Sequence, residues 1–492
     1  MYKMQRRLSI ITITIASIME FIRSQRGAAK LCYEGFTYTK KKETKSTMRW
    51  ECSQRRSENC KGTATTDNPP TRVISSTDHV HVNDQFYVEA LKVRQEITAA
   101  VISNGGQPHR ILADKLVHHP VEVRVAAGTT ETIKRHMRAK KAGQTPKNPE
   151  KLEDIPIPFP EAYRTKLIYD NESTRSRMLV FASEAGLGLL ESATTWFMDG
   201  TFSTAPHVFD QVFTVRVPLG EMSGTVAYAL LPSKDQTSYE ECMTAVLDAC
   251  LTRDIRPTPS KVVCDFEVAI HNAVRQVMAN DIQIQGCFYH LTQSTWRRIQ
   301  GDGLQVLYRE DEEIRQFCGR LDGLALLPTD KVLEGMAILK DTAPSALTGI
   351  VDYFDNTYVS GGFRSVRTAD GMMRFRRTPP RFPLDIWNVH AATVSDEART
   401  NNLCEAWNNG FQVLVGHQHP SLWTVVDCFM KDAAMVETEV YRVRNGEPSI
   451  KPKKKSTERY QRRLKTLCEQ VASGEKSVSQ FLNVVGGLVR LK

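Results

Sequence analysis

Beyond residue 160, the chain follows an order of strand-like and helix-like segments that leaves few folds open. Three apolar strand-like segments come first, and amphipathic helices then alternate with short strands. This order predicts a mixed α/β sheet with helices packed on its faces. The expected strands are residues 194–198, 211–219, 225–231, 261–264 and 284–288, and the expected helices are 238–251, 268–278, 291–299 and 402–415.

Charge and proline content divide the chain ahead of this sheet. Residues 1–61 carry 14 Lys and Arg against 5 Asp and Glu, whereas the chain beyond residue 150 is slightly acidic overall. Five prolines in residues 142–160 indicate an extended linker and a domain boundary. Basic charge concentrated ahead of a near-neutral body is typical of a nucleic-acid-binding module, and a basic surface that only aids solubility is the alternative.

We therefore expect an α+β multidomain chain. Two short helices near residues 108–117 and 130–141 are compatible with a helix-turn-helix, although short helices joined by a turn are common. The helical segment that contains them is a candidate for DNA binding. The expected parts are a small β module at 19–83, a helical segment at 84–145, a Pro-rich linker at 146–161, a sheet domain at 162–301 and 391–416, a helical insertion at 302–390 and a basic helical tail at 417–492.

The N-terminal 18 residues resemble a signal peptide only superficially. Basic residues precede an apolar run over residues 8–18, but this run is too short to span a bilayer and lacks a small-x-small cleavage site. We expect a strand or an extension there, and a mistaken start site is the alternative. The eleven cysteines are an odd number spread over a long chain, which favours a reducing compartment over a disulfide scaffold. No membrane association is expected.

Two cysteines and two histidines are spaced as a closed ligand set for structural zinc. Cys52 and Cys60 are followed by His79 and His81. Two thiolates and two imidazoles satisfy a tetrahedral Zn²⁺ ion. Residues two apart on an extended strand point to the same side, so both rings can reach one ion. The gap between the cysteines is wider than zinc sites usually have, so the spacing alone leaves free thiols and a surface histidine pair as the alternative.

The residues around these ligands resemble the FLYWCH-type zinc finger in order and spacing, over about residues 19–83. The one departure is Gly35-Phe36, where the family has Gly-Tyr. The resemblance implies that the four ligands hold Zn²⁺ in a small β module with Phe21, Tyr38 and Trp50 in its core. Such modules are associated with DNA or protein binding, and the excess of Lys and Arg fits phosphate contact. The matching residues are Phe21-Ile22, Ser24, Arg26-Gly27, Leu31, Gly35-Phe36-Thr37-Tyr38, Trp50, Cys52, Cys60-Lys61 and His79-x-His81.

Three acidic residues lie at the boundaries of expected elements in the sheet domain. Asp199 and Asp265 each end an apolar strand, and Glu405 lies early in a helix. If the two strands are neighbours, their carboxylates repel each other unless a divalent cation such as Mg²⁺ relieves the repulsion. Two such ions can activate an attacking oxygen and stabilise a leaving oxygen in phosphoryl transfer. For any one of these residues, a helix cap or turn former is the alternative.

The segments around these carboxylates are similar to the Mutator-like-element (MULE) transposase domain, over about residues 160–415. A FLYWCH-type finger ahead of this domain is a known family arrangement. The resemblance implies an RNase-H-like fold with a helical insertion. It also implies Asp199, Asp265 and Glu405 as the catalytic triad of a DNA strand-transfer enzyme that uses Mg²⁺ or Mn²⁺, with nearby Glu397 as the alternative third acid. The matching segments are Asp199-Gly200-Thr201-Phe202, Tyr228-Ala229-Leu230-Leu231-Pro232, Asp265-Phe266-Glu267, Gly286-Cys287-Phe288-Tyr289-His290-Leu291 and Thr400-Asn401-Asn402.

Cys287 and His290 belong to the same family pattern, after a strand and at the start of a helix. Two ligands alone do not fill a zinc site. Further histidine ligands are the candidates His390, His417 and His419. We favour the alternative that Cys287 and His290 pack and form hydrogen bonds beside the active site.

The sequence thus predicts a nuclear, zinc-finger DNA-binding transposase of the DDE type, which would act as a homo-oligomer if it is active. It would hydrolyse a phosphodiester and use the released 3′-hydroxyl for strand transfer. The alternative is a domesticated, catalytically silent DNA-binding or transcription-regulatory protein, because function depends on the site rather than the fold. Residues 451–455 read equally as a nuclear localisation signal, a phosphate-contact patch or a solvated tail.

Overall fold

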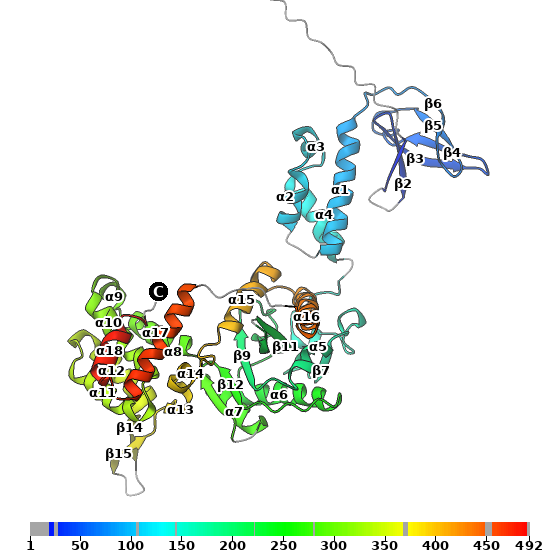
Figure 1. The fold of residues 1–492 in the computed structure, drawn as a ribbon. Helices are drawn as coiled ribbons and strands as arrows, with labels where there is room; N and C mark the ends of the chain where they lie inside the picture. Colours follow the sequence, from blue (N-terminus) through cyan, green and yellow to red (C-terminus); the bar gives the residue numbers. More distant parts are fainter. Residues whose placement is uncertain are drawn as a thin grey trace, which may run out of the picture. The chain divides into compact units, whose positions relative to one another are not determined.

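The computed structural model describes residues 19–23, 28–104, 108–142, 145–220, 222–278, 281–367, 372–447 and 455–489. The apolar run at 8–18, residues 451–454 of the basic run, and Ser24 and Arg26-Gly27 of the finger pattern lie outside the described residues. The chain forms two compact units, which divide between Lys147 and Asn148 (Figure 1).

The first unit begins with a six-stranded antiparallel sheet in which each strand pairs with the next along the chain. Leu31, Tyr38, Trp50 and Ala64 form its small buried core. Phe21 was expected in this core, but it is 42% exposed, because it lies on the edge strand β1; its ring centroid is 5.7 Å from that of Trp50. The strands are β1 (Glu20–Arg23), β2 (Ala29–Tyr33), β3 (Phe36–Glu43), β4 (Thr47–Cys52), β5 (Thr63–Asp67) and β6 (Val73–Ser76).

Four helices complete the first unit: α1 (Gln85–Asn104), α2 (Pro108–Leu116), α3 (Val121–Ala126) and α4 (Thr130–Ala142). Val93, Ile97 and Val101 recur every four residues along α1 and are buried against the other three helices, as expected for an amphipathic helix. Near its start, α1 packs on the sheet, where Val88 joins Ile22 and Cys32. The β module and the helical segment were expected as separate domains, and they share one unit because α1 contacts both.

The second unit is built on a seven-stranded sheet in the order β13-β12-β9-β10-β11-β8-β7. Strands β12, β9, β11 and β7 of this sheet are labelled in Figure 1. β10 is antiparallel to both of its neighbours, β9 and β11, and β12 and β13 add in parallel on the other side of β9. This is the mixed sheet that the segment order predicts. The strands are β7 (Leu167–Asp170), β8 (Leu179–Ala182), β9 (Thr195–Thr201), β10 (Gln211–Leu219), β11 (Met222–Leu231), β12 (Lys261–Cys264) and β13 (Gln283–Gly286).

Helices cover both faces of this sheet, because alternate strand residues point to opposite faces. Trp196 and Met198 of β9 pack against α5 (Glu184–Leu189), α6 (Gln236–Leu251) and α7 (Val268–Met278). On the other face, Val212 and Tyr228 pack against α15 (Asn402–Val415) and α16 (Leu422–Arg444). The expected tail therefore begins with a helix that is part of the sheet domain.

Residues 302–390 form a helical region with one β-hairpin, β14 (Gly362–Arg367) and β15 (Met373–Thr378). Its core contains Leu321, Phe354 and Trp387, and α17 and α18 contribute Leu464 and Phe481 to that same core. None of the helices in the described ranges combines the length and hydropathy that a bilayer crossing needs. The helices of this region, together with α8 before it and α17 and α18 after it, are α8 (Phe288–Gly301), α9 (Gln305–Glu310), α10 (Glu312–Gly323), α11 (Val332–Asp341), α12 (Thr348–Phe354), α13 (Leu384–Trp387), α14 (His390–Val394), α17 (Lys455–Ala472) and α18 (Val478–Gly486).

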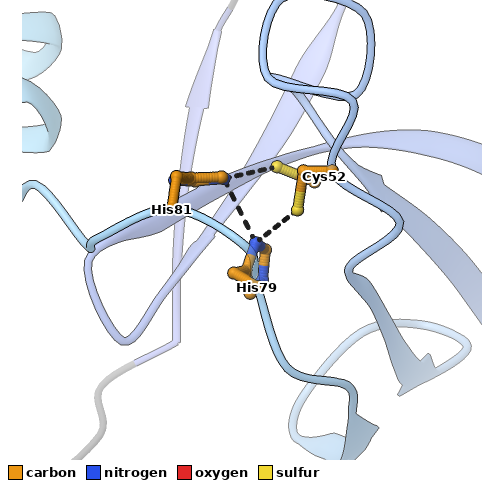
Figure 2. A group of neighbouring side chains, drawn as sticks. Cys52, His79 and His81 are labelled. Carbon is orange, nitrogen blue, oxygen red and sulfur yellow. Dashed lines mark hydrogen bonds between the residues drawn. The ribbon is translucent and has the colours of Figure 1, made fainter.

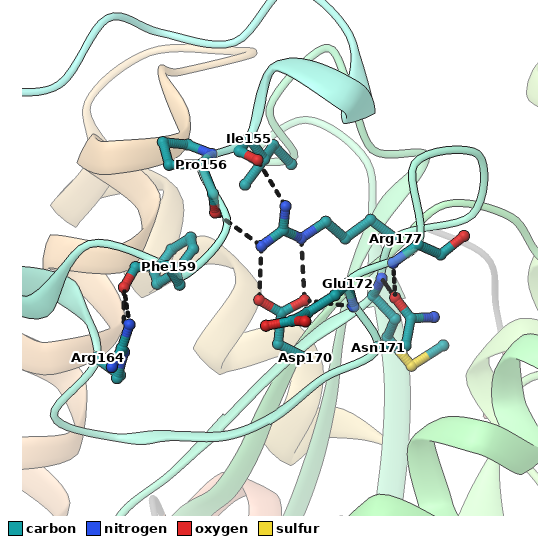
Figure 3. A network of polar contacts seen from close by, with 10 residues as sticks. Ile155, Pro156, Phe159, Arg164, Asp170, Asn171, Glu172 and Arg177 are labelled. Atoms are coloured by element: carbon teal, nitrogen blue, oxygen red, sulfur yellow. Dashed lines mark hydrogen bonds and ion pairs between the residues drawn. The ribbon is translucent and has the colours of Figure 1, made fainter.

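The segment expected as a linker is packed on the second unit from Asn148 onward. Arg177 is 1% exposed and donates to the carbonyl oxygens of Ile155 at 2.6 Å and Pro156 at 3.0 Å (Figure 3). Its guanidinium also forms two hydrogen bonds with the Asp170 carboxylate, at 2.9 and 2.7 Å. This buried arginine therefore ties the Pro-rich segment to β7.

Replacing Arg177 with methionine is expected to destabilise the second unit by about 3 kcal/mol, because Asp170 and two carbonyl groups lose a buried partner. Urea unfolding of the full chain, followed by tryptophan fluorescence, measures the change. Arg175→Met is the matched control, since Arg175 is exposed two residues away, and it should stay within about 0.5 kcal/mol of wild type. Equal stability of the two variants would contradict this role for Arg177.

Candidate functional site

Four side chains converge beside the sheet of the first unit. Cys52 ends β4, Cys60 precedes β5, and His79 and His81 follow β6. Their ligand atoms all lie within 4.8 Å of one another. Cys52 Sγ is 3.2 Å from His81 Nε2, Cys60 Sγ is 3.3 Å from His79 Nδ1, and the two histidine nitrogens are 3.4 Å apart (Figure 2). The structure thus brings the four predicted ligands together.

The ring of His79 is held from outside this cluster. The Tyr38 hydroxyl lies 2.9 Å from His79 Nε2, and the Phe36 ring stacks on the imidazole with centroids 3.8 Å apart. Gly62 is needed for this packing, because a Cβ there would lie 2.6 Å from the ring. Outer contacts of this kind orient metal-binding histidines. Burial lowers the pKa of His79 and so favours the neutral form that binds metal. Two sulfur and two nitrogen donors suit Zn²⁺.

In the second unit, strand pairing places two carboxylates side by side. Val263 of β12 is the direct partner of Phe197 on the parallel strand β9. Asp199 and Asp265 each follow two residues later, on the same face as these partners. Asp265 follows the end of its strand as expected, whereas β9 continues through Asp199 to Thr201, because the pairing with β10 extends that far.

Glu405 reaches the same place from α15. Phe197 and Val263 pack on Cys404, the residue before Glu405. Asp199, Asp265 and Glu405 line one cleft with a volume of about 340 Å³. Three segments that are far apart in the sequence therefore contribute one carboxylate each.

The electrostatics of the cleft show that negative charge is concentrated there. Burial, together with the nearby charges of Asp265 and Glu405, raises the pKa of Asp199 to about 7, against the hydrogen bond that Asn408 Nδ2 donates at 2.9 Å. Burial and Asp265 also raise the pKa of Glu405. Glu405 Oε1 is buried without a hydrogen-bond partner. A divalent cation would relieve this repulsion and give the unpaired oxygen a partner.

Asn401 positions α15, and sequence reasoning did not assign it this role. Its side chain is fully buried and donates from Nδ2 to the carbonyl oxygen of Met198 at 3.0 Å. Its backbone N–H donates to Cys287 Sγ, also at 3.0 Å. Glu405 lies one helical turn further, so these bonds fix it beside β9. The Thr400-Asn401-Asn402 segment in the sequence is the signal that marks this position.

Cys287 and His290 lie at this site. Their ligand atoms and that of Glu405 lie within 4.8 Å of one another, and His290 Nδ1 is 3.4 Å from Asp265 Oδ1. Burial raises the pKa of the Cys287 thiol to about 12. A protonated thiol that accepts the Asn401 hydrogen bond fits packing beside the carboxylate cleft. Among the described residues, none of His390, His417 and His419 belongs to this group.

Glu397, the alternative third acid, lies elsewhere. It forms an ion pair with Lys261 at 2.9 Å. Lys261 begins β12, whereas Asp265 follows the other end of that strand. Of the two glutamates, Glu405 is the one that lines the cleft.

The cleft residues Gln211, Gln293 and Arg297 had no sequence signal, because they are single polar residues on β10 and α8. Gln211 donates to the Tyr239 hydroxyl at 2.8 Å, and this hydroxyl donates to Glu267 at 2.9 Å. Gln293 and Arg297 extend from α8 along another wall of the cleft. Arg297 adds a positive charge to a site that is otherwise rich in carboxylates.

Two family models match the chain. The FLYWCH zinc finger domain matches residues 21–81, and the MULE transposase domain matches residues 195–294. These matches confirm both resemblances in the expected order. The first contains all four Cys and His residues of the cluster, and the second contains Asp199 and Asp265 but ends before Glu405. A search of curated proteins found no significant match. The two domains together support a transposase-like protein that contains a zinc finger.

Proposed function

We propose that this chain is a DNA transposase of the DDE type, in which the first unit binds DNA and the second cleaves and joins phosphodiesters with Mg²⁺ or Mn²⁺. The observation that carries the proposal is the convergence of Asp199, Asp265 and Glu405 on one cleft. Each carboxylate comes from a different element, and the repulsion among them is what divalent cations relieve.

The strand arrangement supports an RNase-H-like fold for the second unit. Three antiparallel strands, β9 to β11, are extended by the parallel strands β12 and β13 beside β9. This order is the one that an RNase-H-like sheet has. The helical region at 302–390 then separates α8 from α15, which brings Glu405 back to the cleft.

In the proposed reaction, water attacks phosphorus and the P–O3′ bond breaks, which releases a 3′-hydroxyl and leaves a 5′-phosphate. This 3′-hydroxyl then attacks a target phosphodiester, and a new P–O bond forms as the P–O3′ bond of the target strand breaks and its O3′ leaves with a proton. The bound metal ions would supply Lewis-acid activation and charge neutralisation. Asp199, Asp265 and Glu405 would hold these ions with their carboxylates. Asn408 orients the Asp199 carboxylate. Arg297, on the cleft wall, is placed to bind a phosphate oxygen.

The first unit supplies DNA binding through a finger that holds Zn²⁺ on Cys52, Cys60, His79 and His81. Exposed Lys and Arg on the sheet fit contact with phosphates, including residues 40–42 on β3 and Arg49 on β4. DNA as the substrate places the protein in the nucleus. A transposase of this kind acts on two DNA ends, so we propose a homo-oligomer.

The choice of third acid gives a direct test of the site. Glu405→Gln in the full chain is expected to slow Mn²⁺-dependent nicking of supercoiled DNA at least about 100-fold, because one anionic ligand is lost. Glu397→Gln is the matched control and should nick at the wild-type rate. Slow nicking by Glu397→Gln, with nicking at the wild-type rate by Glu405→Gln, would instead assign Glu397 as the third carboxylate of the site. Wild-type protein that does not nick would instead favour the silent DNA-binding alternative.

A further inference from the structure

The hairpin of β14 and β15 in the second unit is dense in arginine, and the proposed reaction makes no use of it. Residues 362–381 contain six arginines and one acidic residue, Asp370. The large apolar side chains on the hairpin are exposed rather than packed. Phe363 is 73% exposed and Phe375 is 79% exposed.

The strand register separates these side chains onto two faces. Arg364 lies opposite Arg376, and Val366 lies opposite Arg374, so three arginines share one face. Three alternate pairs lie on the other face, which are Phe363 with Arg377, Ser365 with Phe375, and Arg367 with Met373. One face is therefore cationic, and the other combines aromatic and basic side chains.

This composition suits a partner rather than an isolated hairpin. A two-stranded ribbon is marginally stable alone, and like charges directly opposite each other, as at Arg364 and Arg376, destabilise it further. Phosphates would neutralise this charge, and unpaired bases stack on exposed aromatic rings. The charge and the exposed phenylalanines thus fit DNA.

The base of the hairpin packs beside the catalytic carboxylates. Tyr358, before β14, and Phe382, after β15, both contact Phe266, with ring centroids 5.8 and 5.1 Å away. Phe266 directly follows Asp265. The hairpin therefore extends from the edge of the cleft, and its six-residue strands give it a reach of about 20 Å.

We propose that this hairpin is a DNA-binding arm for the strand that enters the cleft. Arg364, Arg374 and Arg376 bind phosphates, and Phe363 and Phe375 contact bases that are unpaired near the cleavage point. The assignment of DNA as the ligand rests on the proposed function of the second unit. The proposal that the hairpin is a binding arm rests on its charge, on the exposure of its side chains and on its strand register.

The test uses the full chain without Mn²⁺ and a labelled DNA duplex, either unbroken or carrying a short single-stranded gap. Arg364→Gln/Arg376→Gln is expected to weaken binding of both DNAs about tenfold and to reduce the slope of log affinity against log salt by about 2. Arg175→Gln/Arg256→Gln is the matched control, since it removes two exposed arginines elsewhere in the second unit. It should bind as wild type does.

A second variant tests the aromatic face. Phe363→Ser/Phe375→Ser is expected to weaken binding to the gapped duplex about tenfold and to leave binding to the unbroken duplex unchanged. Thermal unfolding should match wild type for every variant, because all the substituted side chains are exposed. Equal weakening for both DNAs would overturn the role of the phenylalanines.

If Arg364→Gln/Arg376→Gln binds DNA with the affinity and the salt dependence of wild type, the proposal that the hairpin is a DNA-binding arm is overturned. An altered oligomeric state with unchanged DNA affinity would also overturn it and assign the hairpin to contact between copies. Failure of the wild type to nick DNA, with the effects on binding still present, would refute the proposed catalysis and leave the arm standing. No DNA binding by the wild type would overturn both.

Discussion

Replacing Asp265 with asparagine is expected to abolish metal-dependent nicking of DNA while DNA affinity stays unchanged. The charge of Asp265 raises the pKa of both Asp199 and Glu405, so its carboxylate lies near both of theirs. Asparagine keeps the size of the side chain but removes an anionic ligand. Metal-ion stabilisation of the transition state is worth several kcal/mol, so the nicking rate should fall by roughly 1000-fold or more. The measurement is the initial rate on supercoiled DNA with Mn²⁺.

Asp254→Asn is the control for this variant. Asp254 is an exposed acid of the second unit at a φ of 57°, which asparagine also tolerates. It should nick and bind as wild type does. Substantial residual nicking by Asp265→Asn would remove Asp265 from the active site. If neither wild type nor variant nicks DNA, the domesticated regulator becomes the better explanation, and selection of a DNA-binding sequence is the next experiment.

Replacing Cys52 with alanine is expected to abolish zinc binding and unfold the sheet of the first unit. The core of that sheet is only Leu31, Tyr38, Trp50 and Ala64. A core so small depends on its metal, and zinc binding contributes about 10–16 kcal/mol to folding in comparable modules. Metal analysis of the full chain should show the loss of bound zinc. Amide hydrogen exchange over β2 to β5 should show the loss of protection.

Cys32→Ala is the matched control, because Cys32 is buried in the same sheet but packs with Ile22 and Val88 on the face toward α1. It should retain full zinc content, with a moderate loss of stability from the smaller side chain. Zinc content and amide protection at wild-type levels in Cys52→Ala would contradict the assignment of Cys52 as a ligand.

The parts of the fold that depend on local pattern could be predicted from the sequence. Strands β10 and β12 and helices α7 and α15 have the expected bounds, because their apolar periodicity is continuous over each element. The Cys and His cluster could also be predicted from the sequence, because its members lie within one small β module. His79 and His81 are two residues apart, so in an extended segment their side chains point to the same side. The carboxylates required a further inference, that the two strands are neighbours, which the pairing of Val263 with Phe197 supports.

The features that could not be predicted depend on contacts between distant segments. Strands β7 and β8 are as short as β12, but no segment like Asp265-Phe266-Glu267, which directly follows β12, marks where they end. The Pro-rich segment resembles a free linker, because the partner that holds it, Arg177, lies beyond it in the sequence. Nothing local indicates that Phe21 is on an edge, or that Asn401 bonds to Met198 on a remote strand.

The packing of α17 and α18 sets the order in which a newly made chain can become functional. These helices complete the core that also holds α8, and α8 carries His290 and Arg297 into the cleft. On the ribosome, Leu464 emerges about 140 residues after Leu321, an interval on the order of ten seconds. Until then, apolar side chains of this incomplete core are exposed, and chaperones can bind them. We therefore expect the proposed DNA cleavage to begin only after synthesis has passed α18.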